Sequence, residues 1–296
     1  MTRVAFLGLG AIGAPMASHL TKSPFELTVW NRTRSKADDF TKEFGGSVAN
    51  TPLEAARGAE IVFTCLPSSR EVGDVLAGPN GILAGFSNGA TLIDCTSGDP
   101  AASREFAAVI EGRGGSFMDA PVSGGIIGAK AGTLTVMCGG DEGVLERVRP
   151  ALEAFGKKIV LCGPVGSGHA VKAVSNALLA VDVWSTAEAL AALKRLGVHS
   201  DIALDVINAS AGRSNASQNL FPDRVLTRAF PRTFRLALLD KDIGIAMKLA
   251  GESGAPTPLI DLAAKLIHEA HLELGEEADH VEAAKVVESR SGVVIE

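Results

Sequence analysis

Short apolar runs alternate with helical stretches up to about residue 163, and this alternation limits the possible folds more than any other feature of the sequence. Strands are expected at 4–8, 27–30, 61–66, 91–95, 116–120, 134–138 and 158–162, and helices at 14–22, 33–44, 101–112 and 142–155. Short strands that alternate with helices favour a mainly parallel sheet with helices on both faces. The sequence therefore predicts an α/β domain with a doubly wound sheet over residues 1–163.

After residue 163 the expected strands stop. The turn-rich segment "GPVGSG" (163–168) is followed by helical patterns at 167–196, 201–211, 236–252, 256–274 and 279–288. We interpret the change as a domain boundary and expect an all-helical substrate and oligomerisation domain over 164–296, with the helix at about 167–196 as the bridge. Apolar helix faces such as "IGIAMKLA" and "PLIDLAAKLI" favour a homodimer or homotetramer, although a monomeric helical bundle is the alternative.

Composition and charge exclude several classes of protein. The net charge of -6, without a Lys/Arg-rich run, argues against a nucleic-acid partner. No apolar stretch approaches the roughly 18 residues of a membrane span, and glycines interrupt the first apolar run too early for a signal peptide. We expect a soluble, cytoplasmic protein without a membrane partner.

Residue types that carry metal or redox chemistry are sparse. The four cysteines, Cys65, Cys95, Cys138 and Cys162, form no CxxC pair, so we interpret them as small hydrophobic residues beside the sheet. The sequence contains neither HExxH nor another recognisable ligand cluster, and no metal site is expected. Because the chain has no tyrosine, dehydrogenases that use a tyrosine as proton donor are excluded.

A glycine-rich loop directly follows the first expected strand and opens the first helix. The pattern Gly8-x-Gly10-x-x-Gly13 in this position is typical of Rossmann-type dinucleotide binding. Gly8 permits the tight turn, Gly10 lets a pyrophosphate approach, and Gly13 allows close packing of helix on strand. A glycine-rich turn without a ligand is the alternative. The expected cofactor-binding residues of this loop are Gly8, Leu9, Gly10, Ala11, Ile12 and Gly13.

The end of the second strand indicates which dinucleotide binds. Asn31 stands where an NAD site usually has a carboxylate, and Arg32, Thr33 and Arg34 follow it. A carboxylate would repel a 2′-phosphate, whereas a guanidinium binds one. NADP(H) is therefore favoured over NAD(H), with Asn31, Arg32 and Thr33 among its ligands, although a solvated loop would explain the arginines too.

Two further strand ends are expected at the same edge of the sheet. The third expected strand ends at Leu66 and is followed by Pro67, and Thr96 and Ser97 follow the fourth. Open α/β sheets bind ligands at the carboxyl ends of their strands, so these residues are expected near the nicotinamide. Ordinary turn chemistry is the alternative for Pro67, and the sequence leaves open whether Thr96 or Ser97 contacts the ligands.

The segment "DAPVSGG" (119–125) follows the fifth strand. Ser123 offers a hydroxyl, and Gly124 and Gly125 offer exposed backbone N–H groups. This combination suits a carboxylate, as an anion-binding nest does, so we expect a small anionic substrate here. A loop that needs glycine only for its backbone is the alternative.

Taken together, the chain resembles the β-hydroxyacid dehydrogenase family, which includes 3-hydroxyisobutyrate dehydrogenase and glyoxylate/succinic semialdehyde reductases. The resemblance rests on "GLGAIG", "NRT", "CLP", "DCTSGDP", "DAPVSGG", "GPVGSGHAVKAVSN", "AEAL" and "KDIGIAM", in the family's order over nearly the whole chain. It implies that Lys172 is the catalytic lysine, that Ser123, Gly124 and Gly125 anchor the substrate and that Asn176 orients it. It also implies that Lys241 reaches the nicotinamide, and that Phe234 and Asp242 help to close the substrate pocket.

The implied role explains why a lysine lies inside the apolar helix at 167–196. Lys172 and Asn176 are four residues apart and share one helix face. Oxidation of a β-hydroxy acid removes a hydride from carbon and a proton from oxygen, and a lysine on a rigid helix can accept that proton and return it. A lysine that extends to solvent is the alternative.

Some residues depart from the family pattern. Ile12 replaces a methionine, "DCTSGDP" inverts the common Ser-Thr order, Ala177 replaces a second amide, and "GRSNAS" lacks an aromatic residue. The substrate is therefore the least certain part of the resemblance. We expect an NADP(H)-dependent enzyme that acts on a small β-hydroxy acid or its semialdehyde, such as succinic semialdehyde or glyoxylate. An imine reductase, which generally lacks the helix lysine, and a non-catalytic NADPH-binding scaffold are the alternatives.

Overall fold

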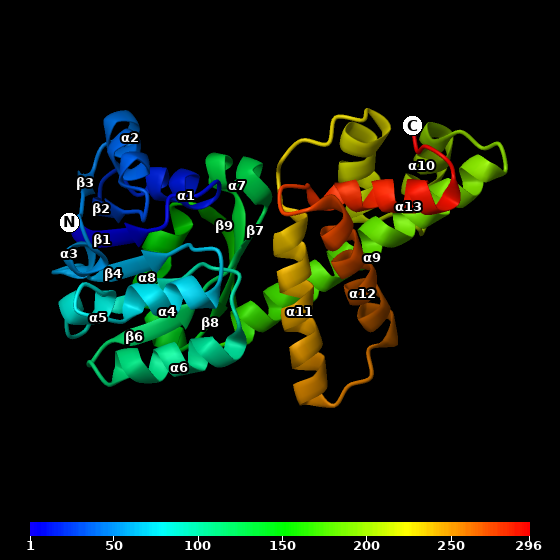
Figure 1. Cartoon of the computed structure of the whole chain (residues 1–296). Coiled ribbons are helices and arrows are strands. Elements are labelled where there is room, and N and C mark those ends of the chain that lie inside the picture. The colour runs from blue at the N-terminus through cyan, green and yellow to red at the C-terminus, as the bar shows by residue number, and fades with distance from the viewer. The chain divides into compact units, whose positions relative to one another are not determined.

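The computed structural model describes every residue from Met1 to Glu296, and the chain divides into two units, Met1–Lys172 and Ala173–Glu296 (Figure 1). The first unit contains all nine strands, and the second is entirely helical. None of the helices combines the length and the apolar composition that crossing a membrane requires.

The strands of the first unit form one sheet in the order β3-β2-β1-β4-β5-β6-β8-β7, with β9 paired to β8. All neighbouring pairs from β3 to β6 are parallel, as is β8 with β9, whereas β8 runs antiparallel to β6 and β7. The prediction of a mainly parallel sheet is confirmed. The strands are β1 Thr2–Leu7, β2 Phe25–Trp30, β3 Ser47–Val48, β4 Ile61–Thr64, β5 Thr91–Asp94, β6 Ser116–Asp119, β7 Val122–Ser123, β8 Leu134–Gly139 and β9 Gly156–Gly163.

Both faces of the sheet are buried at its central strands, as β1 shows most clearly. Side chains alternate between the two faces of a strand, so Val4 and Phe6 join one apolar cluster while Ala5 and Leu7 join the other. Phe6 stacks on Phe63 at 5.6 Å between ring centroids. The helices whose buried residues join the first cluster are α1 Gly13–His19, α2 Arg34–Phe44, α7 Gly125–Ala131 and α8 Glu142–Glu153. Those of the second are α3 Pro52–Ala56, α4 Ser69–Leu76, α5 Ile82–Gly85 and α6 Pro100–Glu111.

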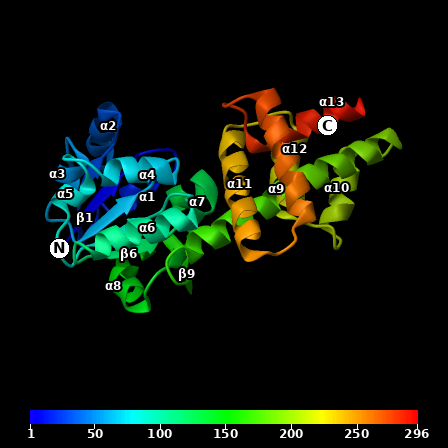
Figure 2. The ribbon, with the colours of Figure 1, turned by 60° about the horizontal axis from the view of Figure 1, so that its bottom comes forward.

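The second unit consists of helices alone (Figure 2). They pack around one apolar core that includes Phe221, Leu239 and Ile267. Its long helix α9, Ser167–Arg195, begins in the first unit and continues through the second. The others are α10 Ser200–Asn208, the π-helix η1 Ala216–Leu226, α11 Leu236–Ser253, α12 Pro258–Leu274, the 3-10 turn η2 His280–Glu282 and α13 Ala283–Ser291. The prediction of an all-helical second part is confirmed.

Several elements were not expected from the sequence. The strands β3 and β7 have two residues each, too few for an apolar alternation to stand out. The π-helix η1 contains Pro222 and a polar start, so neither its composition nor its period indicates a helix. The expected helix at 279–288 begins instead with a separate turn, which Asp279 caps by accepting from the Val281 N–H.

Candidate functional site

Four parallel strands of the first unit end at the same level. Leu7 pairs with Thr64, Thr64 with Asp94, and Asp94 with Asp119. The segments that follow these residues therefore leave the sheet at one carboxyl edge, where open α/β sheets bind ligands. They contain the expected site residues Gly8–Gly13, Leu66, Pro67, Thr96, Ser97 and Ser123–Gly125.

The glycines of the first loop differ in what surrounds them. A Cβ on Gly8 would lie 2.3 Å from the Cys65 carbonyl oxygen, and one on Gly13 would lie 2.0 Å from the Gly8 carbonyl oxygen. Gly8 also has a φ of +107°, which favours glycine. A Cβ on Gly10, in contrast, would have no atom of the chain within 4 Å. The chain itself therefore needs Gly8 and Gly13, whereas the open space at Gly10 fits the close approach of a dinucleotide.

Asn31 connects the end of β2 to this loop. Its side-chain oxygen accepts a hydrogen bond from the Leu9 N–H at 3.0 Å, and its amide group donates to the Thr33 carbonyl. Arg34 donates to Asp38 at 2.8 Å and to Asn50, whereas Arg32 is exposed and takes part in no ion pair of the unit. Asn31 thus has a structural role, and Arg32 is the guanidinium that remains accessible to a phosphate.

Thr96 and Ser97 occupy different environments. Thr96 is buried, its hydroxyl accepts from the Leu66 N–H at 3.1 Å, and its own N–H donates to Asp94 at 3.1 Å. Thr96 therefore fixes the loops after β4 and β5 to each other. Ser97 and Leu66 are partly exposed, and Pro67 is exposed.

The segment expected to bind a carboxylate turns sharply after β7. Gly124 and Gly125 have φ of +134° and +62°, and both are exposed, while Ser123 is partly exposed. A Cβ on Gly125 would meet no atom of the chain within 4 Å. The Ser123 hydroxyl and an open glycine backbone therefore lie together, as an anion-binding loop requires.

Asp119, the first residue of the same 119–125 segment, holds the start of the lysine helix. Its two carboxylate oxygens accept from the backbone N–H groups of Gly166 at 2.6 Å and His169 at 2.8 Å. The first N–H groups of a helix lack partners within the helix, so a buried carboxylate there satisfies them. Burial raises the pKa of Asp119, and these N–H donors oppose that rise. Lys172 lies one turn further along α9.

His169 extends this buried polar group. Its side chain is fully buried, and its Nδ1 lies 2.7 Å from the Ser103 hydroxyl oxygen. Its Nε2 lies 4.0 Å from an oxygen of the buried Asp94. Sequence analysis missed Asp94, Asp119 and His169 as site residues. A carboxylate as the last residue of two neighbouring parallel strands is the signal that could have found the first two.

The second unit brings together three of the expected residues. The buried Asn176 donates from Nδ2 to Asp242 at 2.6 Å, and the Lys241 ammonium lies 2.7 Å from the other oxygen of the same carboxylate. Asp242 is almost fully buried. Asn176 and Asp242, 66 positions apart in the sequence, thus join with Lys241 in one charged, hydrogen-bonded group on α9 and α11.

Phe234 lies apart from that group, in the segment before α11. Its ring packs on His280, with 5.4 Å between centroids, and its backbone N–H donates to Asp279 at 2.9 Å. Phe234 is therefore part of the packing around the η2 turn, and its expected role at the substrate stays a prediction.

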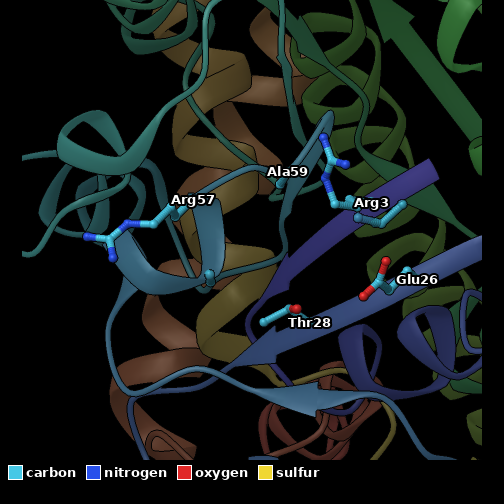
Figure 3. A pocket seen from close by; sticks show the side chains of 7 residues that line it. Arg3, Glu26, Thr28, Arg57 and Ala59 are labelled. Carbon is cyan, nitrogen blue, oxygen red and sulfur yellow. The ribbon is translucent and has the colours of Figure 1, made fainter. Parts of the chain in front are cut away.

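A separate cavity in the first unit lies at the opposite edge of the sheet. Arg3, Glu26 and Thr28, near the starts of β1 and β2, line it together with Arg57 and Ala59 (Figure 3). Its volume is about 50 Å³, far below the several hundred Å³ of a typical small-molecule site. It does not bear on the candidate site.

Comparison with known families agrees with this arrangement. Residues 3–163 match the NAD binding domain of 6-phosphogluconate dehydrogenase, and residues 166–287 match the family described as NAD-binding of NADP-dependent 3-hydroxyisobutyrate dehydrogenase. The mitochondrial 3-hydroxyisobutyrate dehydrogenase of Mus musculus is 37% identical, with 88% of this chain and 80% of that protein covered. An NAD-dependent L-serine dehydrogenase of Pseudomonas aeruginosa is 36% identical, with 90% and 91% covered.

Solved structures resemble the whole chain. The 3-hydroxyisobutyrate dehydrogenase of Mycobacterium tuberculosis, determined with L-serine, superposes with a TM-score of 0.89 at 32% identity and covers 97% of this chain and 99% of its own. An imine reductase of Bacillus cereus has a TM-score of 0.64 at 21% identity and covers 97% and 99%. The second likeness shows the fold alone.

Proposed function

Because the chain belongs to the β-hydroxyacid dehydrogenase family, we propose that it is an NADP(H)-dependent oxidoreductase that interconverts a small β-hydroxy acid and its semialdehyde. One observation carries the proposal. The 119–125 segment both offers the Ser123–Gly125 anion loop and, through Asp119, holds the helix that carries Lys172. The same short segment thus links a substrate anchor to a proton carrier.

The chain's own residues would divide the chemistry between them. A bound nicotinamide supplies hydride transfer. The Ser123 hydroxyl and the N–H groups of Gly124 and Gly125 would hold the substrate carboxylate, which fixes the hydroxyl-bearing carbon. Lys172 would accept the hydroxyl proton during oxidation and donate it to the new alkoxide during reduction. Asn176, one helical turn beyond Lys172, would orient the reacting oxygen.

Cofactor preference rests on the end of β2. Arg32 is exposed and outside the ion pairs of the unit, whereas Arg34 is held by Asp38 and Asn50. We assign the 2′-phosphate to Arg32 and Thr33, with Asn31 as the residue that shapes the loop. The relative from Pseudomonas aeruginosa is named as NAD-dependent, so both cofactors have to be measured.

The remaining contacts follow from exposure and charge. Ser97, Leu66 and Pro67 would contact the nicotinamide side, because Thr96 is buried between the two loops that it joins. Lys241, paired with Asp242, would contact the cofactor, and Asp242 and Phe234 would act on the substrate side. We also propose a homo-oligomer, since Leu259 and Leu262 are exposed on α12. Light scattering of the purified chain tests that part.

The decisive experiment is steady-state NADPH oxidation with a panel of small semialdehydes, with NADH in parallel and Lys172→Ala as the control. Oxidation of 3-hydroxyisobutyrate and L-serine with NADP+ and NAD+ completes the panel, because relatives are named for these compounds. Turnover that Lys172→Ala abolishes while cofactor still binds supports the proposal. Cofactor binding without turnover of any compound favours the scaffold. A cyclic imine is assayed alongside the panel, and turnover of the imine alone favours an imine reductase.

A further inference from the structure

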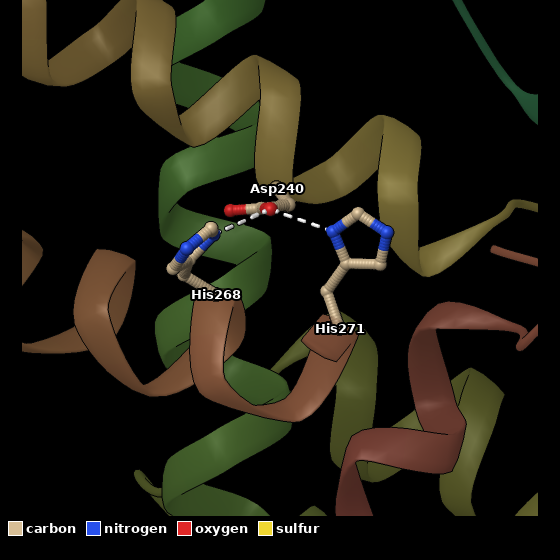
Figure 4. Close-up of side chains that lie close together, drawn as sticks. All are labelled: Asp240, His268 and His271. Carbon is tan, nitrogen blue, oxygen red and sulfur yellow. Dashed lines mark hydrogen bonds and ion pairs between the residues drawn. The ribbon is translucent and has the colours of Figure 1, made fainter. Parts of the chain in front are cut away.

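Three side chains of the second unit converge outside the groups described so far. Asp240 on α11 accepts from His271 Nδ1 at 2.8 Å and from His268 Nδ1 at 3.0 Å, both at the same carboxylate oxygen, Oδ2 (Figure 4). His268 and His271 are three residues apart on α12, so one helix face presents both rings. The three potential ligand atoms all lie within 4.8 Å of one another.

From this geometry we propose that Asp240, His268 and His271 form a binding site for a divalent transition-metal ion of the zinc class. Two imidazole nitrogens and one carboxylate oxygen are a common ligand set of open zinc sites. Tetrahedral ligand atoms at ordinary zinc bond lengths are about 3.3 Å apart. The two hydrogen-bond distances from Asp240 are slightly shorter, so small side-chain rotations would admit the ion.

An independent feature supports the proposal. The other nitrogen of His271, Nε2, lies 3.2 Å from the Glu276 carboxylate. Histidines that bind metals usually donate from their second nitrogen to a carboxylate, which fixes the ring and strengthens the ligand. Glu276 is therefore assigned as a positioning residue that directs His271 Nδ1 toward Asp240.

The three side chains are exposed enough for an ion to reach them from solvent and to keep water as a further ligand. The side chains of Asp240 and His271 are each 17% exposed, whereas that of His268 is 59% exposed. The ion would thus be held at one side by the α11 and α12 helices, with water completing its coordination at the other. Because the ligands come from two helices, a bound ion would join α11 to α12.

Isothermal titration of the tag-free, EDTA-treated full chain with ZnCl2 tests the site. The hydrogen bond to Asp240 raises the pKa of His271, and protons compete with metal, so the titration is made at about pH 8. We expect one ion per chain with micromolar affinity and a higher unfolding temperature with zinc. The variant His268→Ala/His271→Ala should bind at least ~100-fold more weakly, and Glu276→Gln ~10-fold more weakly.

His199→Ala is the matched control, because His199 is an exposed surface histidine that caps no helix through its side chain. It should bind zinc as the natural chain does. Absence of saturable micromolar binding, or equal binding by the double variant, would overturn the site. Equal binding by Glu276→Gln would overturn the role of Glu276. The double variant removes one exposed and one largely buried imidazole, so an unchanged circular dichroism spectrum and unfolding temperature without metal would confirm that lost binding is not lost folding.

Discussion

Asp119 accepts a hydrogen bond from the His169 N–H at 2.8 Å, and this contact joins the end of β6 to the first turn of the helix that carries Lys172. The other oxygen of the same carboxylate accepts from Gly166 at 2.6 Å. The proton transfer proposed for Lys172 requires that turn to be fixed, so the Asp119 carboxylate would position Lys172 without touching the substrate.

Asp119→Asn should therefore reduce both stability and turnover. The asparagine amide would direct a donor at one of the two N–H groups, which costs about 1–3 kcal/mol of unfolding free energy. We expect kcat to fall ~10-fold or more, because small misplacements of reacting groups are costly, while KM for NADPH changes little. Urea unfolding and steady-state kinetics provide the measurements.

Asp141→Asn is the control for that experiment. Asp141 caps α8 through one hydrogen bond to the Val144 N–H at 3.0 Å, and asparagine caps helices about as well as aspartate. This variant should change the unfolding free energy by a few tenths of a kcal/mol and leave kcat unchanged. Equal effects of the two substitutions would contradict the positioning role of Asp119.

Lys172→Ala should lower kcat by about 10²–10⁴-fold, the usual contribution of a positioned acid or base. Lys172→Arg should be almost as slow, because a guanidinium keeps its proton in proteins. Fluorescence titration with NADPH should give nearly the same Kd for both variants and the natural chain. A kcat within a few-fold of the natural value in the alanine variant would mean that another group moves the proton.

Arg32→Ala should weaken NADPH binding ~10-fold or more and leave NADH binding unchanged. The reason is the loss of charge-assisted hydrogen bonds to the 2′-phosphate, each worth about 1.5–3 kcal/mol. Arg34→Ala is the matched control, since Arg34 is already bound to Asp38 and Asn50. If Arg34→Ala, and not Arg32→Ala, lost the preference for NADPH over NADH, the assignment of the 2′-phosphate to Arg32 would be wrong.

The acid side of the stability profile should depend on Asp279. Burial alone would raise the pKa of this carboxyl, but the hydrogen bond with His280 and the N–H groups of Phe234 and Thr233 hold it well below its usual range. A lowered pKa in the folded state stabilises the protein fully above the unfolded value, near pH 4, and this contribution is lost as the pH falls further.

Asp279→Asn should accordingly lower the unfolding free energy at pH 7 and reduce its dependence on pH below about 4. Thermal unfolding of both chains between about pH 3 and pH 7 measures this. Asp39→Asn, at an exposed residue of α2, should keep the natural profile. If the unfolding temperature fell equally steeply below about pH 4 in the natural chain and in Asp279→Asn, the prediction would be wrong.

The architecture could be predicted because its signals are local. The strand-to-helix alternation, the Gly8–Gly13 loop and the helical second part each depend on residues near one another in the chain. The η1 helix could not be predicted, because Pro222 and the polar residues at its start are not typical of a helix. Packing against the rest of the second unit stabilises it. Likewise, nothing local marks Asp119 as the partner of His169, 50 residues further along.

The same distinction between local and distant contacts explains why the roles of some side chains could not be predicted from the sequence. Asn31 was expected to contact the cofactor from its position alone, yet it also holds the Leu9 N–H. The histidines of "HEAH" (268–271) match no zinc motif because their third partner, Asp240, is on another helix. Hydrogen bonds between distant segments therefore distinguish residues that position other groups from residues expected to contact a ligand. The spacing of residues in the sequence does not reveal these hydrogen bonds.

Gly10 has open space on the side where the Cβ of any other residue would point, while Gly8 and Gly13 are pressed against neighbouring carbonyls. In a saturation library of this chain, substitutions at Gly8 and Gly13 would therefore deplete the protein in cells, whereas alanine at Gly10 would leave its abundance intact and remove its activity. Positions where substitution lowers activity but not abundance would then identify the residues that line the dinucleotide site.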